Sequence, residues 1–143
     1  MKFVEISWQS EWYRQELQLR DRLLRAPLGL AFDATELDAE QHQLHFGIID
    51  DQSKLIACVV AVALSPSQAK IRQMVVDLPY QRQGTGTLLL KKTELELADR
   101  GFRSIELNAR DLATEFYEKL GYRVEGEPFI EVKIPHFKMS KRL

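Results

Sequence analysis

Two glycines within a polar stretch form the feature of this chain that points most clearly to a ligand-binding site. The residues Q-R-Q-G-T-G, Gln81 to Gly86, follow the apolar run Met74–Val76 and the breaker Pro79, and they precede Leu88–Leu90. This order predicts a strand, a tight loop and the start of a helix. The first turn of a helix presents unpaired N–H groups and the positive end of the helix dipole, and glycines let a ligand approach the backbone. The stretch could therefore bind a phosphate.

Two common phosphate-binding motifs do not fit this loop. A dinucleotide-binding fingerprint needs a third glycine where this chain has Leu89, and a P-loop needs G-K-[S/T] after four intervening residues. The strands predicted before the loop also form a meander and not a βαβ unit. A dinucleotide-binding oxidoreductase is therefore disfavoured. An ordinary helix-start loop with two glycines is the structural alternative.

A second pattern lies in the stretch N-A-R-D-L-A-T-E-F-Y-E-K-L-G-Y, residues 108–122. Ala113, Phe116, Tyr117 and Leu120 recur at i, i+3, i+4 and i+7, which places them on one face of a helix. Spacing alone favours a packing role, with Tyr117 as a core tyrosine whose hydroxyl reaches the rim.

Composition describes an ordinary globular chain. Its 143 residues fit one domain, 1–143, and the net charge of -1 gives no reason to expect nucleic acid or an anionic membrane as a partner. The apolar run 55–64 is too short to span a bilayer, and Glu5 interrupts the apolar character that a signal peptide needs. The single cysteine, Cys58, lies in that run, which predicts a buried thiol and a reducing compartment. We expect a cytoplasmic protein.

The strands and helices that position these residues are predicted from the hydrophobic periodicity and from residues that interrupt helices or strands, such as proline and glycine. Strands are expected at 3–7, 43–49, 55–64, 69–76, 104–108, 123–132 and 136–139, with a turn at 50–54. Helices are expected at 11–25, capped by Ser10, at 84–100 with Leu88, Leu89, Leu95 and Ala98 inward, and at 112–120, capped by Asp111. The stretch 33–43 is expected to be a loop or a short irregular helix.

Two details of the strands bear on a site. Polar and apolar residues alternate up to Gln73 and then stop alternating at Met74–Val76, and such a lost period can mark a bulge. Pro135 suggests an edge strand or a bulge, and an exposed edge there could pair with a second subunit to give a homodimer. The predicted order is β-α-β-β-β-α-β-α-β-β, an α/β protein with a mixed sheet.

The two motifs together resemble the GNAT acyltransferases, which bind acetyl-coenzyme A. Q-R-Q-G-T-G resembles their Q/R-x-x-G-x-G/A pyrophosphate loop, and A-x-x-F-Y-E-K-L-G-Y resembles their second signature. The stretches I-R-Q-M-V-V and E-V-K-I-P-H-F-K-M are similar to those of small bacterial YjcF-like members. The resemblance covers about Met74 to Tyr122, and the predicted element order agrees with the GNAT fold.

The resemblance implies a set of site residues. In GNAT folds the fourth strand splays from the fifth and leaves backbone groups free for the pantetheine arm. The tyrosine matching Tyr117 points at the coenzyme sulfur, where a phenol can protonate the departing thiolate. Many members have asparagine where this chain has Arg110, which could reach a phosphate instead. The implied coenzyme contacts are Met74, Val75, Val76, Gln81, Arg82, Gln83, Gly84, Thr85, Gly86, Thr87, Asn108, Arg110 and Phe116.

The amine acceptor needs a base or a water relay. Glu131 and His136 are candidate catalytic bases because in GNAT folds the C-terminal strands border the acceptor cleft, although a solvated glutamate and a structural histidine are the alternatives. Arg72 and Gln73 are candidate substrate contacts, and an ion pair is equally expected for Arg72. Glu106 is a further candidate. His42 and His45 show no metal-ligand spacing, so no metal is expected.

The sequence therefore predicts a transferase: an acetyl-CoA-dependent N-acetyltransferase that acts directly on a primary amine of a small molecule or peptide. The alternative is a non-catalytic acyl-CoA-binding sensor or regulatory module, which would keep the loop at Gln81–Gly86 and lose the acid, so the presence of Tyr117 argues against it.

Overall fold

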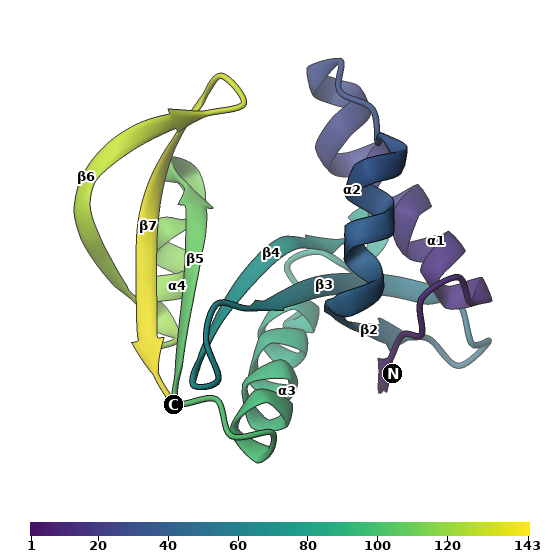
Figure 1. Cartoon of the computed structure of the whole chain (residues 1–143). Helices are drawn as coiled ribbons and strands as arrows, with labels where there is room; N and C mark the ends of the chain where they lie inside the picture. Colours follow the sequence, from purple (N-terminus) through teal and green to yellow (C-terminus); the bar gives the residue numbers. More distant parts are fainter. The chain divides into compact units, whose positions relative to one another are not determined.

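Seven strands form a mixed sheet in the order β1-β2-β3-β4-β5-β7-β6. The structure is a computed structural model that describes residues 1–143 (Figure 1). In chain order its elements are β1 (Lys2–Glu5), α1 (Glu11–Arg20), α2 (Ala34–Ala39), β2 (Leu44–Ile49), β3 (Leu55–Ala63), β4 (Gln68–Val76), α3 (Thr85–Asp99), β5 (Ser104–Arg110), α4 (Thr114–Lys119), β6 (Arg123–Glu131) and β7 (Ile134–Arg142). The predicted order is confirmed, with α2 as the short irregular helix allowed for 33–43.

Contacts along the chain divide it into two units. The N-terminal unit comprises Met1–Ala61 and Gln73–Thr93, and the C-terminal unit comprises Val62–Arg72 and Glu94–Leu143. A single domain for 1–143 stays a prediction. No helix of the chain is both long enough and apolar enough to cross a membrane.

In the N-terminal unit, β1, β2 and β3 pair as antiparallel neighbours. The apolar side chains of β2 and β3 are almost all buried, as their unbroken hydrophobic runs predict, and Cys58 is fully buried among them. The turn between the two strands is the predicted one, because the Asp50 carboxylate accepts hydrogen bonds from the N–H groups of Gln52 and Lys54.

Helix α1 begins where predicted and changes geometry before its predicted end. The Ser10 hydroxyl accepts a hydrogen bond from the Tyr13 N–H at 3.2 Å and so caps the first turn. From Asp21 to Arg25 the chain continues as a π-helical turn, and it stops at Gly29, whose φ is +70°.

The inner face of α1 carries charges that the hydrophobic pattern does not predict. Glu16 and Arg20 are fully buried, as is Glu40, which follows α2. The Arg20 guanidinium donates to Glu16 at 2.6 Å and to both carboxylate oxygens of Glu40, at 2.8 and 2.5 Å. The Tyr13 hydroxyl donates to Glu40 at 2.8 Å. Removing one partner from a buried pair of this kind typically costs about 3–5 kcal/mol of stability, because an unpaired charge is left inside.

His45 on β2 completes this buried charge cluster of Glu16, Arg20, Glu40 and His45. Its Nδ1 lies 3.0 Å from both Glu16 carboxylate oxygens and its Nε2 lies 3.0 Å from the Glu40 carbonyl oxygen. Both ring nitrogens therefore face acceptors, and the charged imidazolium satisfies both. Burial is the largest single influence and opposes this charge, but the hydrogen bonds and negative charges of Glu16 and Glu40 together outweigh it and raise the pKa of His45.

The cluster also has the composition of a metal site. Glu16, Glu40 and His45 offer ligand atoms within 4.8 Å of one another. The Arg20 guanidinium, however, is hydrogen-bonded to both carboxylates and supplies the positive charge that an ion would bring. The cluster is a network of ion pairs, and the expectation of no metal stays a prediction.

In the C-terminal unit, β4 and β5 are parallel, β5 and β7 are antiparallel, and β6 pairs only with β7 (Figure 1). Strand β7 is longer than the predicted 136–139 and lies between β5 and β6. The edge strand is therefore β6, which corrects the expectation of an edge at Pro135. Pro135 is tolerated because the pairing of β7 with β5 begins only at His136. Any strand pairing with a second subunit at this edge would involve β6.

Two helix predictions need correction. In α3 the buried residues include Leu89, Leu90 and Leu97, whereas Leu95 is 62% exposed and Ala98 is exposed as well.

Helix α4 begins only at Thr114 after a 3₁₀ turn, and the Asp111 carboxylate accepts from the Leu112 N–H within that turn without capping α4. The predicted end of this helix at Gly121, with φ +95°, is confirmed.

The raised pKa of His45 predicts how stability depends on pH. A group whose pKa is raised in the folded state stabilises the fold fully below its ordinary value of 6.5, and this contribution is lost as the pH rises through the raised value. The difference in free energy of unfolding between the wild type and His45→Gln should therefore shrink as the pH rises above neutrality. Urea unfolding of both proteins across this range measures it. A difference that stays constant, or grows with pH, would show that His45 is not a buried cation.

Candidate active site

The glycine loop, residues Gln81–Gly86, belongs to the N-terminal unit and is braced by its own side chains. A 3₁₀ turn at Leu78–Tyr80 leads into it. The Gln81 side-chain amide donates to the Val76 carbonyl at 2.8 Å, and the Gln83 amide donates to the Pro79 carbonyl at 2.9 Å. Both side-chain amides are thus occupied by hydrogen bonds within the loop. The backbone groups of Gln81 and Gln83 therefore remain to contact a ligand.

The end of the loop has the features that the glycines predict. Gly84 has φ +83°, and a Cβ built there would meet no atom within 4 Å, so open space lies beside this backbone. The Gly84 carbonyl accepts the first helical hydrogen bond, from the Leu88 N–H at 2.9 Å, and α3 begins at Thr85. The first N–H groups of an α-helix have no partner within the helix. An anionic group such as a diphosphate fits this end of α3, with the exposed Arg82 beside it in the sequence.

Strand β4 changes conformation at the predicted point. Gln73, inside the strand, has φ +53°, which L side chains rarely adopt, and Met74–Val76 follow directly. The Gln73 side-chain oxygen accepts a long hydrogen bond, 3.4 Å, from Arg20 Nε. This part of β4 belongs to the N-terminal unit. In the C-terminal unit, the pairing of β4 with β5 covers Gln68–Ile71.

Tyr117 lies on α4 in the C-terminal unit within a group of aromatic rings. The rings of Phe116 and Tyr122 meet it edge to face, with centroids 5.0 and 5.8 Å away. The Tyr122 hydroxyl donates to Glu94 at 2.8 Å. Burial raises the pKa of Tyr117 to about 12, so this phenol keeps its proton at neutral pH and can act only as a donor of it.

The two candidate bases lie together at the β6–β7 turn of the C-terminal unit. His136 is buried, and its Nδ1 lies 2.7 Å from the Ile134 carbonyl, which fixes a proton on that nitrogen. Its Nε2 lies 3.6 Å from a carboxylate oxygen of Glu131. The Phe129 ring stacks on the imidazole with centroids 6.0 Å apart. A neutral ring with its proton on Nδ1 presents Nε2 as a proton acceptor on the side where Glu131 lies.

The remaining predicted residues of this unit lie on β5. Asn108 and Arg110 project to the face opposite the buried Ile105, Leu107 and Ala109, and they pair in register with Lys138 and His136. Register thus places Arg110 beside one of the candidate bases.

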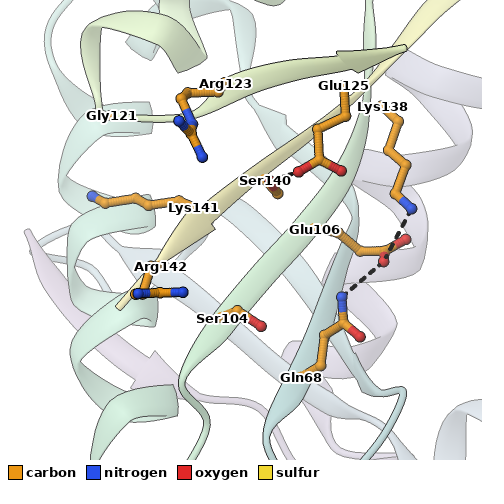
Figure 2. A pocket seen from close by; sticks show the side chains of 10 residues that line it. All are labelled: Gln68, Ser104, Glu106, Gly121, Arg123, Glu125, Lys138, Ser140, Lys141 and Arg142. Atoms are coloured by element: carbon orange, nitrogen blue, oxygen red, sulfur yellow. Dashed lines mark hydrogen bonds and ion pairs between the residues drawn. The ribbon is translucent and has the colours of Figure 1, made fainter.

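Figure 2 shows a polar hollow on the same unit. Glu106 lies inside it, where it accepts a hydrogen bond from Gln68 at 3.1 Å and lies 3.7 Å from Lys138, which makes it a structural partner more than a base. The lining of the hollow contains none of the other predicted site residues. It consists of Gln68, Ser104, Glu106, Gly121, Arg123, Glu125, Lys138, Ser140, Lys141 and Arg142.

The sequence reasoning missed the buried ionic residues. Both lie in the helix predicted for 11–25, where Glu16 follows Tyr13 by three positions and Arg20 follows Glu16 by four. That spacing is the signal that could have found them, because it places both on the buried face. Their partners lie far along the chain, where the helical spacing gives no information.

Comparison with known proteins defines the family. The model of the acetyltransferase (GNAT) domain matches residues 31–143, and the chain therefore belongs to the GNAT acetyltransferases. The Bacillus subtilis protein YitI, named as an N-acetyltransferase, is 27% identical over 117 residues, which is 78% of each chain. YjcF of the same organism, also so named, is 37% identical over 73 residues. That match covers 50% of this chain, which spans about half the length of YjcF (52%).

The same fold occurs in solved structures. The crystal structure of an aminoglycoside 6'-N-acetyltransferase complexed with coenzyme A matches with a TM-score of 0.83 at 20% identity, over 99% of this chain and 97% of that one. The resemblance seen in the two motifs and the predicted GNAT fold are thus confirmed. The roles of the individual site residues stay predictions.

Replacing Gly84 tests the loop. Gly84→Asp places a negative charge where a diphosphate is expected and should abolish measurable binding of coenzyme A in calorimetry. Gly84→Asn is the matched control, because it imposes the same strain at φ +83° without the charge. The aspartate variant should bind at least about tenfold more weakly than the asparagine variant, or about 1.4 kcal/mol. Equal affinities of the two variants and the wild type would refute the loop assignment.

Proposed function

We propose that this protein transfers the acetyl group of acetyl-CoA directly to a primary amine of a small molecule or peptide. The observation that carries the proposal is the glycine loop at the start of α3 within a GNAT domain, with open space beside Gly84. A transferase of this kind must hold a diphosphate, polarise a thioester carbonyl, remove a proton from the amine and supply one to the leaving thiolate.

The N-terminal unit supplies the binding groups in this proposal. The N–H groups of Gly84–Thr87 and the Arg82 side chain bind the diphosphate of the coenzyme. The backbone of Met74–Val76, which follows the left-handed Gln73, binds its pantetheine arm and polarises the thioester carbonyl. When bound, acetyl-CoA brings an activated acyl group and a thiol leaving group.

The C-terminal unit supplies proton transfer. Tyr117, which keeps its proton because of its raised pKa, donates it to the sulfur as the carbon–sulfur bond breaks. His136 Nε2 accepts the proton that the amine loses as its nitrogen attacks the carbonyl carbon, and Glu131 stabilises the resulting imidazolium from 3.6 Å.

His136→Gln, which keeps a polar side chain but has no basic nitrogen, should therefore lower turnover with little change in coenzyme affinity.

The acceptor class rests on chemistry and family. Amines are the acceptors named for relatives such as the aminoglycoside 6'-N-acetyltransferase, and a primary amine gives a stable amide. For this chain the proposal extends to primary amines of small molecules or peptides.

Calorimetry with acetyl-CoA, together with a free-thiol assay against pooled amines, tests the function. Binding with thiol release that depends on an amine is the expected result. Binding without release from any pool would favour an acyl-CoA sensor. Absence of binding would refute the proposal itself.

Tyr117→Phe tests the proposed acid. The ring and its contacts with Phe116 and Tyr122 are kept, and only the hydroxyl is lost. We expect turnover to fall by about 10²–10⁴-fold, the usual contribution of general acid catalysis, with coenzyme affinity nearly unchanged. Steady-state kinetics and calorimetry measure the two effects. Equal turnover of variant and wild type would reduce Tyr117 to a packing residue.

A further inference from the structure

The short segment Met74–Val76 lies between two residues that are each held by an arginine. On one side, Arg20 Nε donates to the Gln73 side-chain oxygen at 3.4 Å. On the other side, an Arg22 guanidinium nitrogen lies 3.0 Å from an Asp77 carboxylate oxygen. Both arginines come from the end of α1 and the π-helical turn that follows it. All these residues belong to the N-terminal unit.

The Gln73 end of the segment needs support because its backbone is unfavourable. A non-glycine residue with φ near +53° persists where surrounding contacts fix it. Arg20 can provide that support because it is itself immobilised. Its side chain is fully buried and hydrogen-bonded to Glu16 and to both carboxylate oxygens of Glu40.

The Asp77 end is held by several bonds at once. The Asp77 side chain is only 7% exposed, its carboxylate also accepts from the Leu78 N–H at 2.9 Å, and its own N–H donates to the Ile56 carbonyl at 2.8 Å. Burial alone would raise the pKa of Asp77, but the bonds from Arg22 and Leu78 outweigh it and lower the pKa. This carboxylate is therefore charged at neutral pH and forms an ion pair with Arg22.

Arg20 also contacts the segment between α1 and α2. Its guanidinium lies over the Phe32 ring, 4.9 Å from the centroid, and the Arg25 guanidinium lies 4.2 Å from the same centroid. Arg25 is paired with Glu36 of α2 at 2.7 Å. The end of α1 is thereby fixed against α2 as well as against β4, which makes it a rigid base for both arginines.

We propose that Arg20 and Arg22 are positioning residues that fix the backbone of Met74–Val76 from its two ends. We call the two contacts, Arg20 with Gln73 and Arg22 with Asp77, the arginine clamp. The inference rests on the proposed function, in which these backbone groups polarise the thioester carbonyl. Donors that act on developing charge must be held in place before the reaction, since small displacements weaken them greatly.

Arg22→Gln is the informative variant. The Arg22 side chain is 53% exposed, so its loss should not unfold the protein, whereas an Arg20 substitution would leave buried charges unpaired. Arg14→Gln is the matched control, because Arg14 pairs with Glu11 on the exposed face of α1, the helix that leads into the turn carrying Arg22. Arg22→Lys keeps the charge and tests for rescue.

The first readout is amide hydrogen exchange of Met74, Val75 and Val76, measured by NMR without any substrate. Exchange should be at least about tenfold faster in Arg22→Gln, intermediate in Arg22→Lys and unchanged in Arg14→Gln. Unchanged exchange in Arg22→Gln would overturn the clamp.

The second readout is the split between kcat and KM. In Arg22→Gln we expect kcat to fall about tenfold with KM for acetyl-CoA within about twofold, and Arg22→Lys should recover part of the loss. A purely structural role would lower the melting temperature and leave kcat unchanged, and that result would overturn the positioning role. A wild type that acetylates no amine would refute the proposed function, while the exchange data would still decide whether the arginines hold the segment.

Discussion

The Arg20 guanidinium is fully buried between the carboxylates of Glu16 and Glu40, and much of the N-terminal unit depends on this interaction. It ties the inner face of α1 to the chain after α2, and through Glu16 and Glu40 it favours the charged form of His45 on β2. Buried charges are tolerated only where nearly every donor and acceptor has a partner. An arrangement that separated these partners would leave buried charges unpaired, and the observed one brings Arg20 against Gln73, at the start of the β4 segment expected to bind the acyl group.

Each unit contributes its own kind of chemistry in this account. The N-terminal unit offers mainly backbone groups: the loop at Gly84, the start of α3 and the segment Met74–Val76. The C-terminal unit offers the side chains proposed to transfer protons: Tyr117, which lies among aromatic rings, and His136, which contacts the Ile134 carbonyl and Glu131. Binding by backbone and proton transfer by side chains are separate demands, since an anion needs fixed dipoles whereas proton transfer needs a group with a suitable pKa.

The features that the sequence predicted are those with local causes. Ser10 caps α1, Asp50 closes the β2–β3 turn and Gly84 leads into α3, because each depends on neighbours a few positions away. The features that escaped prediction depend on distant partners. The burial of Arg20 requires Glu40, 20 residues away, and Gln73, 53 residues away. Periodicity also could not decide which leucines of α3 are buried, and it missed the full length of β7, which is set by pairing with both neighbours.

In the proposed reaction, acetyl-CoA contacts the start of α3 and the segment Met74–Val76. An NMR titration of the ¹⁵N-labelled protein with acetyl-CoA tests it most directly. The largest amide shift changes should fall at Gly84–Thr87 and at Met74–Val76, and free coenzyme A should reproduce the first set but only part of the second. Binding that leaves the amides of both segments unchanged would show that acetyl-CoA does not bind in this way.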